Sequence, residues 1–180
     1  MNTKIHSIVT AAMLAAMTTV ATMIIKVPTI GTNGYVNIGD SIVLASAWLL
    51  GNPYGALAAG IGSALADLLS GYPVYVPGTA VIKFLMAFVC AILTSLMKNR
   101  KIPVVAACIV SSLAAEIIMI LGYFLYEATI LGYGFAAAAS IGSNAIQAGV
   151  CMVLGNLLYH ALSGIRKGVG LGGTDKSADH

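Results

Sequence analysis

The stretches PGTAVIKFLMAFVCAILTSL, residues 77–96, and PVVAACIVSSLAAEIIMILGYFLY, residues 103–126, decide the fold class of this chain. Each is an apolar run long enough to cross a bilayer as a helix, which takes about 20 residues. Each also contains one charged residue, Lys83 in the first and Glu116 in the second. A charge at such a depth costs roughly 2.5–3.5 kcal/mol and usually faces a bundle interior or a wet cavity. These two residues are therefore the first candidates for a site that binds a small polar molecule.

The composition indicates a protein that lies almost entirely in the membrane. Of the 180 residues, 59% are hydrophobic and 8% are charged, and the mean hydropathy is +0.94. Soluble domains carry about 25% charged residues. At roughly 20 residues per span, the length allows about six helices and no soluble catalytic module. The net charge of +3 comes from basic residues near the span ends and does not indicate nucleic-acid binding.

We expect an all-α membrane protein with six transmembrane helices in residues 1–167, followed by a polar, Gly-rich cytoplasmic tail, residues 168–180. The second span begins near Asp40, a good N-cap residue, and is too short to cross a bilayer upright. If both termini are cytoplasmic, only Lys26 falls outside, and the basic residues on the inner side are Lys4, Lys98, Arg100, Lys101, Arg166, Lys167 and Lys176. This orientation satisfies the positive-inside rule, and the reverse would violate it.

In this topology several polar side chains share the outer part of the membrane. At 1.5 Å per residue their depths overlap, with Glu116 the deepest. Converging polar groups predict a pocket open to the exterior rather than a pore. The residues concerned are Asp40, Asp67, Lys83, Glu116, Tyr123, Asn144 and Gln147.

The polar residues inside the spans each have a structural alternative to ligand contact. Lys83 and Asp67 lie on neighbouring spans and could form an ion pair, which stabilises little by itself. Asn144 and Gln147 are three residues apart and share one helix face, where amides also make interhelical hydrogen bonds. Glu116 can accept paired hydrogen bonds from an aminopyrimidine edge or bind an amine, which favours a pyrimidine or cationic ligand.

The residues near the outer surface also have a structural alternative to ligand contact. Tyr35 and Asn37 lie in the loop between the first two spans, where they contact a ligand or shape a turn. Tyr75 and Tyr123 stack on a flat ring or belong to the interfacial aromatic belt. We expect no metal site and no cofactor, because the three histidines are far apart and without other ligand residues: His6, His160 and His180.

The segment GYVNIGDSIVLASAWLLGNPYGALAAGIGSALADLLSGYPVYVPGTAVIKFLMAF, residues 34–88, resembles the S components of energy-coupling factor (ECF) transporters, the bacterial vitamin-uptake systems. Its G-D pair and the run G-x-x-x-G-A-x-A-x-G-I-G-S-A-L-A-D-L-L-S-G-Y are similar to the riboflavin, pyridoxine and hydroxymethylpyrimidine branch. The resemblance implies a six-helix bundle in the bacterial plasma membrane that binds its vitamin from outside. It also implies docking on one transmembrane coupling subunit and two ATPases, followed by toppling and release inside. The chain itself has no G-x-x-x-x-G-K-[ST] loop for ATP.

The resemblance further implies that small residues of the first span, in an A-x-x-x-A pattern, dock on the coupling subunit. Ala11 and Ala15 match this pattern, and Ala12 and Ala16 form an adjacent register. Spacing by four puts each pair on one helix face, where another helix can approach closely. The alternative is ordinary Ala-rich packing inside the fold.

The leading hypothesis is a vitamin-binding transport subunit, with hydroxymethylpyrimidine or a B6 vitamer favoured and riboflavin or a deazapurine precursor left open. A second class is an intramembrane enzyme that uses Asp67, Glu116 and Lys83 as acid–base groups. No metal or paired-carboxylate motif in the sequence supports it. A third class is a solitary carrier or channel.

Overall fold

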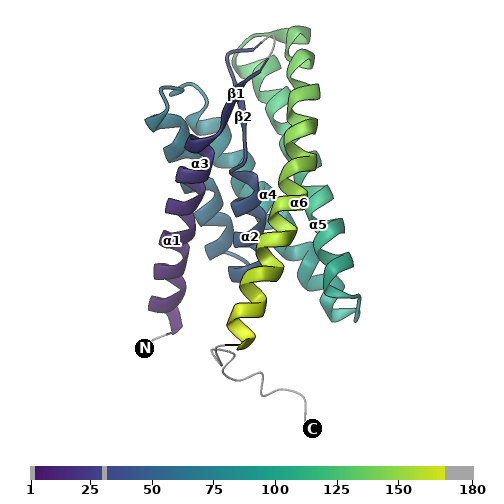
Figure 1. The fold of residues 1–180 in the computed structure, drawn as a ribbon. Coiled ribbons are helices and arrows are strands. Elements are labelled where there is room, and N and C mark those ends of the chain that lie inside the picture. The colour runs from purple at the N-terminus through teal and green to yellow at the C-terminus, as the bar shows by residue number, and fades with distance from the viewer. Residues whose placement is uncertain (1–2, 30–31, 169–180) are drawn as a thin grey trace.

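The computed structural model of the chain describes residues 3–29 and 32–168, with the side chains of residues 3 and 164–168 left out. In these two ranges the chain forms six α-helices, one β-hairpin and two short helical turns (Figure 1). In order they are α1 (Thr3–Ile24), β1 (Lys26–Pro28), β2 (Tyr35–Asn37), α2 (Asp40–Leu50), α3 (Tyr54–Leu69), α4 (Val76–Asn99), α5 (Val104–Leu125), the π-helical turn η1 (Tyr126–Ile130), the 3-10 turn η2 (Gly134–Ala138) and α6 (Ala139–Gly168). Apart from Gly168, the expected tail lies outside the described residues.

The all-helical prediction is confirmed, and four of the helical segments are long and apolar enough to cross a membrane. These segments are Lys4–Ile24, Val76–Asn99, Val104–Ile130 and Gly134–Ser163. The other two helices are shorter, with 11 residues in α2 and 16 in α3. Helix α2 is buried along its length from Asp40 to Trp48, so neighbouring helices rather than lipid surround it.

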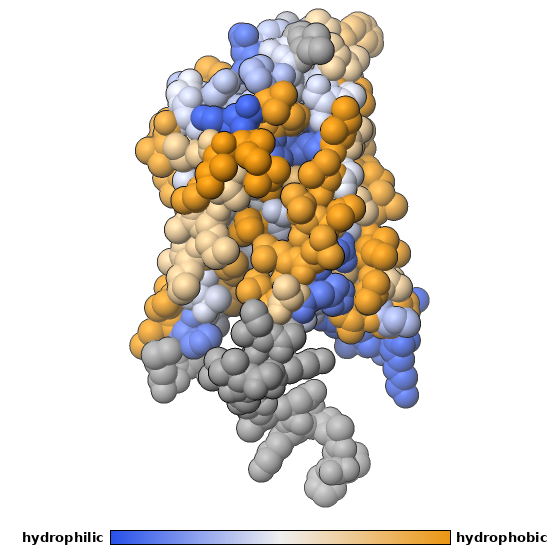
Figure 2. Space-filling model, viewed as in Figure 1, coloured by the Kyte–Doolittle hydropathy of each residue, from blue (hydrophilic) through white to orange (hydrophobic). Residues whose placement is uncertain are grey.

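The outer surface of the bundle is apolar. Large hydrophobic side chains of α1, α3, α4, α5 and α6 are exposed. In Figure 2 they cover the middle of the visible face, and hydrophilic residues gather toward its two ends. This distribution is typical of a surface that faces lipid, because polar groups are costly in the hydrocarbon region.

Glycines allow α3 to pack closely on three neighbours. A Cβ atom on Gly62 would lie 2.5 Å from the backbone oxygen of Ala15 in α1. On Gly55 it would lie 2.5 Å from the backbone oxygen of Ser46 in α2, and on Gly60 it would lie 2.8 Å from that of Ala80 in α4. Such close approach of helix backbones is typical of membrane proteins, where small residues replace the hydrophobic driving force.

The two ends of the bundle differ in what they carry. The hairpin, the loop before α4 and the turns η1 and η2 lie at one end, and the start of α1 and the last turns of α6 lie at the other (Figure 1). The hairpin pairs Lys26 with Asn37 and Pro28 with Tyr35 in an antiparallel register. Its loop is also tied to the residue that precedes η2, since Asn33 Nδ2 donates a hydrogen bond to Tyr133 Oη at 3.0 Å. The hairpin therefore lies as a cover over one end of the helices.

Candidate binding cavity beneath the hairpin

A small polar cavity of about 20 Å³ lies beneath the hairpin, room for about one water molecule. The hairpin and its loop form one side of the wall, and α3, α4, α5, η1 and α6 contribute to the rest, together with the residue that precedes α4. The wall residues are Thr29, Gly34, Tyr35, Asn37, Asp67, Tyr75, Thr79, Tyr123, Glu127, Asn144 and Gln147.

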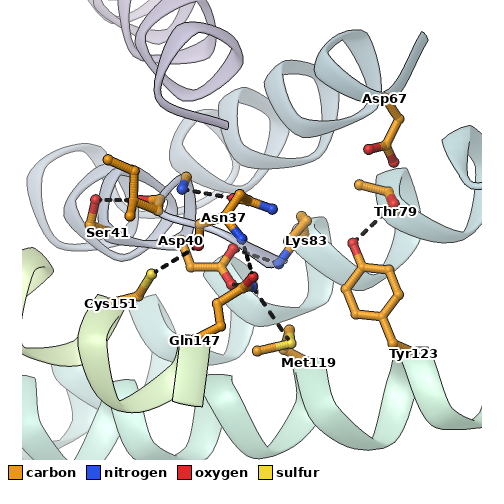
Figure 3. Close-up of polar contacts among 12 residues, drawn as sticks. Asn37, Asp40, Ser41, Asp67, Thr79, Lys83, Met119, Tyr123, Gln147 and Cys151 are labelled. Atoms are coloured by element: carbon orange, nitrogen blue, oxygen red, sulfur yellow. Dashed lines mark hydrogen bonds and ion pairs between the residues drawn. The ribbon is translucent and has the colours of Figure 1, made fainter. Parts of the chain in front are cut away.

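An ion pair lies beneath this wall, between Asp40 at the start of α2 and Lys83 in α4 (Figure 3). Asp40 Oδ1 accepts a hydrogen bond from Lys83 Nζ at 2.5 Å, and Asp40 Oδ2 accepts one from Gln147 Nε2 at 2.5 Å. Asp40 is 1% exposed and Lys83 is 2% exposed, so both charges are removed from solvent. The structure therefore assigns Lys83 a different partner from Asp67, the one considered from sequence.

The expectation that Asp40 caps α2 is wrong. Gly39 occupies the N-cap position, and within the described residues no side chain caps this helix. The Asp40 carboxylate is directed instead toward the buried ammonium of Lys83 and the amide of Gln147. A charge-assisted hydrogen bond between ionised groups is stronger than one to a neutral backbone N–H, which explains the difference.

Gln147 connects the ion pair to the hairpin. Its Oε1 accepts a hydrogen bond from the backbone N–H of Asn37 at 2.5 Å, while its Nε2 donates to Asp40. Lys83 Nζ also lies 5.2 Å from the centroid of the Tyr123 ring, and Tyr123 Oη shares a hydrogen bond with Thr79 Oγ1 at 3.0 Å. A molecule that touches Gln147 or Tyr123 in the cavity would thus touch a direct partner of the buried pair.

Asp67 in α3 meets the hairpin from below. Tyr35 Oη donates a hydrogen bond to Asp67 Oδ1 at 2.6 Å. Burial, and then the neighbouring Asp67 carboxylate, raises the pKa of the Tyr35 phenol, so this phenol remains a donor. The other oxygen, Asp67 Oδ2, is buried without a hydrogen-bond partner among the described residues. One acceptor of the wall is therefore unused.

Glu127 supplies a second carboxylate that sequence reasoning did not place in the site. It lies in η1, is 2% exposed, and accepts hydrogen bonds from Tyr75 Oη at 3.0 Å and Ser140 Oγ at 2.6 Å. Burial, and then Glu127, raises the pKa of the Tyr75 phenol, which stays protonated as the donor. The π-helical turn brings Glu127 into the wall, and no short sequence pattern signals such a turn.

At Gly34 the backbone of the hairpin loop lies close to Glu127 and Tyr75. A Cβ atom at this position would lie 3.2 Å from both Glu127 Oε1 and Tyr75 Oη, and 3.3 Å from Thr29 Oγ1. These separations are tighter than ordinary van der Waals contact. A residue without a side chain thus lets the backbone of the hairpin cover the carboxylate directly.

The predicted site residues separate into two layers. Lys83, Glu116, Asn144 and Gln147 are all buried, so none of them faces lipid. Six of the nine predicted residues line the cavity, namely Asn37, Asp67, Tyr75, Tyr123, Asn144 and Gln147. The wall residues that were not predicted are Thr29, Gly34, Thr79 and Glu127, and Tyr35 was considered only as a loop residue.

The other three predicted residues, Asp40, Lys83 and Glu116, lie outside the wall. Glu116 is 1% exposed, and neither of its carboxylate oxygens has a hydrogen-bond partner in the part of the chain that the structure describes. Glu116 takes no part in the hydrogen bonds that link Lys83 to Asp40 and Asp40 to Gln147 of the cavity wall.

The two alanine pairs of α1 lie in different surroundings. Ala11 and Ala15 are half-buried and pack against the cluster of Leu14, Ile42 and Ala58. Ala12 and Ala16 are exposed. All four line a groove between α1 and α3 whose apolar members include Ile8, Leu57, Ile61 and Leu65.

Together, the fold and the cavity define a class: helical membrane proteins that enclose a polar binding cavity under a cover at one end of the bundle. The family model described as "ECF-type riboflavin transporter, S component" matches residues 2–164. The chain therefore belongs to this family of ECF transporter S components, and the recognition from residues 34–88 is confirmed. Because this family comprises transporter subunits, the chain is not an enzyme, and the intramembrane-enzyme hypothesis does not hold.

Two further comparisons agree with this placement. A solved structure described as "Structure and mechanism of the S component of a bacterial ECF transporter" has a TM-score of 0.67 and 20% sequence identity, covering 91% of this chain and 99% of that one. At that identity the likeness supports the fold. A protein of Pyrococcus woesei described as "Uncharacterized protein in gap 3'region" is 31% identical over 144 residues, which is 80% of this chain and 93% of the relative.

Proposed function

We propose that this chain captures a small vitamin or vitamin precursor from outside the cell membrane, as the substrate-binding subunit of an ECF importer driven by ATP. The observation that carries the proposal is the cavity beneath the hairpin, where polar side chains from several elements meet inside an otherwise apolar protein. Burying polar groups in this way is unfavourable, and a polar ligand that satisfies them offsets the cost.

The proposed orientation places six membrane-embedded helices with both termini in the cytoplasm. The end of the bundle where α1 begins and α6 ends also carries the last turn of α4 and the turn after it, with Lys98, Arg100 and Lys101 (Figure 1). The positive-inside rule then puts the hairpin and its cavity on the outer side. The short helices α2 and α3 lie in the bundle alongside the longer ones.

Among vitamins, hydroxymethylpyrimidine or a B6 vitamer is favoured. Tyr35, Tyr75 and Tyr123 supply aromatic faces and edges around a flat ring, and the acidic residues Asp67 and Glu127 supply acceptors for its polar edge. The cavity is small, so a single-ring ligand requires the smaller movement of the hairpin. Riboflavin, which the family description names, is the second candidate, and a deazapurine precursor is the third.

The experiment that tests capture is mass spectrometry of small molecules that co-purify with the protein, followed by titration with a panel of B vitamins in detergent. We expect one ring compound of the panel to bind at micromolar concentration or below. If no member of the panel binds at micromolar concentration, the vitamin proposal is refuted.

We further propose that α1 docks on the ECF coupling subunit through the exposed register of its alanines. Ala12 and Ala16 are exposed in the groove between α1 and α3, whereas Ala11 and Ala15 also serve packing within the fold. Ala16→Trp should reduce co-purification with the coupling subunit and its two ATPases. Val150→Trp, at an exposed position of α6, is the matched control. Equal co-purification of both variants would refute this docking face.

A transport assay distinguishes a solitary carrier from the proposed subunit. We expect uptake of the bound vitamin into cells to require the coupling subunit and the ATPases. Equal uptake with and without that module would favour the solitary carrier.

A further inference from the structure

We infer that the cavity selects a ring compound whose polar edge carries an amino or ammonium group, and that it excludes phosphorylated, anionic forms of such compounds. The inference rests on the proposed function, because it names the chemistry of the ligand for the same site. It rests on the charges of the wall residues and on the hydrogen-bonding groups of the wall that have no partner.

The charges of the wall are acidic. Asp67 and Glu127 carry carboxylates, and among the wall residues that the structure describes none is Lys, Arg or His. Lys83 lies beneath the wall and is paired with Asp40. Lys26 is exposed on the hairpin, with its Nζ 5.7 Å from the centroid of the Tyr35 ring. An anion in the cavity would meet like charges with little solvent to screen them.

The two phenol donors that face the carboxylates of the wall are committed. Tyr35 donates to Asp67, and Tyr75 donates to Glu127. Because the pKa of each of these phenols is raised, mainly by burial, both remain protonated donors. Gln147 uses its amide nitrogen on Asp40 and its oxygen on the backbone of Asn37.

The unused capacity at the two carboxylates is acceptor capacity. Asp67 Oδ2 is buried and has no partner among the described residues. Each oxygen of Glu127 accepts one hydrogen bond, and a carboxylate oxygen can accept about two. Asn144 lines the cavity, and its amide can serve as donor or acceptor. An amino or ammonium group offers two or three N–H donors on one atom, which match these free carboxylate acceptors.

The test is a set of matched ligand pairs titrated against the purified full chain in detergent at pH 7. The pairs are pyridoxamine and pyridoxine, the aminopyrimidine and its hydroxy analogue, and pyridoxamine and its 5′-phosphate. A hydrogen bond to a charged group changes affinity by about 10- to 100-fold. We therefore expect each amino compound to bind about 10- to 100-fold more tightly than its hydroxyl partner, and the phosphate more weakly than pyridoxamine.

Two variants of the wall test whether its carboxylates cause the preference for amino compounds. Asp67→Asn and Glu127→Gln should each reduce the amino-to-hydroxyl ratio, to about threefold or less, because each removes a charged acceptor. Asp175→Asn makes the same chemical change in the C-terminal tail and should leave the ratio unchanged. If Asp67→Asn does not fold, Glu127→Gln alone decides this part.

Hydroxyl or phosphorylated compounds that bind as tightly as the amino compounds would overturn the inference. An unchanged ratio in the folded wall variants would also overturn it. Tight binding of riboflavin alone would overturn the inference and leave the transport-subunit assignment in place. Failure of every ring compound to bind would refute the proposed vitamin function itself.

Discussion

Two of the charged residues within the helices, Asp40 and Lys83, are paired with each other and removed from water. Asp40 and Lys83 form the buried pair, and the Gln147 amide satisfies the second carboxylate oxygen. A buried pair adds little net stability over an apolar replacement, but removal of one partner leaves an uncompensated charge. The pair therefore fixes the positions of Gln147 and Tyr123 in the wall above it.

This arrangement predicts strong coupling between Asp40 and Lys83. Asp40→Leu and Lys83→Met should each lower the free energy of unfolding by about 3–5 kcal/mol, because each strands the other charge. The double variant should lose much less than the sum of the two single changes. Denaturant unfolding in mixed micelles measures these values, and additive losses would contradict the coupling.

A second prediction concerns Gly34. Gly34→Ala should weaken ligand binding about tenfold, because the added methyl group separates the hairpin from Glu127 and Tyr75. Gly142→Ala is the matched control, since a Cβ atom there meets open space. Equal affinity of Gly34→Ala and the control would show that the hairpin does not need this close approach.

Helices and hairpin differ in how far the sequence predicts them. The long apolar runs predicted α4 and α5, and the second span, which begins near Asp40, was predicted to be short, as α2 is. The hairpin strands have three residues each, too few for a periodic pattern, so residues 26–37 were expected to form only a loop. Pairing of Lys26 with Asn37 depends on contacts with distant helices, such as the bond from Asn37 to Gln147.

Glycine packing of α3 leads to a third prediction. Gly62→Ala should lower the free energy of unfolding by about 1–3 kcal/mol, because its Cβ atom would contact the backbone of Ala15 and push α1 away. Gly149→Ala, in open space on α6, should instead be neutral or stabilising by up to about 1 kcal/mol through helix propensity. Equal effects of the two substitutions would contradict close packing of α1 on α3.

For the whole molecule, the sequence predicted where the site lies better than it predicted the contacts within the site. Depth along the helices placed Asn144, Gln147 and Tyr123 in one zone, and all three line the cavity. The choice of Asp40 rather than Asp67 as the partner of Lys83 depends on how the helices are rotated, which spacing along one chain does not specify. Glu127 reaches the site because it lies in the π-helical turn η1. The residues of this turn carry no distinctive sequence pattern, so Glu127 was not predicted.

The proposed orientation gives a fourth prediction. In intact cells, Lys26→Cys on the hairpin should react with a membrane-impermeant thiol reagent, because the proposed orientation puts the hairpin outside. Lys101→Cys, in the turn between α4 and α5, should react only after the membrane is permeabilised. The three native cysteines are buried, which keeps the background low. The reverse labelling pattern would show that the topology is the opposite of the proposed one.

The most direct test of binding beneath the hairpin is the affinity of Asn144→Leu for the vitamin that the wild-type chain binds most tightly. Asn144 is 6% exposed and lines the cavity, and its amide makes no hydrogen bond with any residue that the structure describes. Leucine should lower the affinity about tenfold or more and leave the free energy of unfolding unchanged or higher, since the lost amide served the ligand. Ile146→Leu, exposed on the same helix, is the control. Unchanged affinity of Asn144→Leu would contradict a ligand site in this cavity.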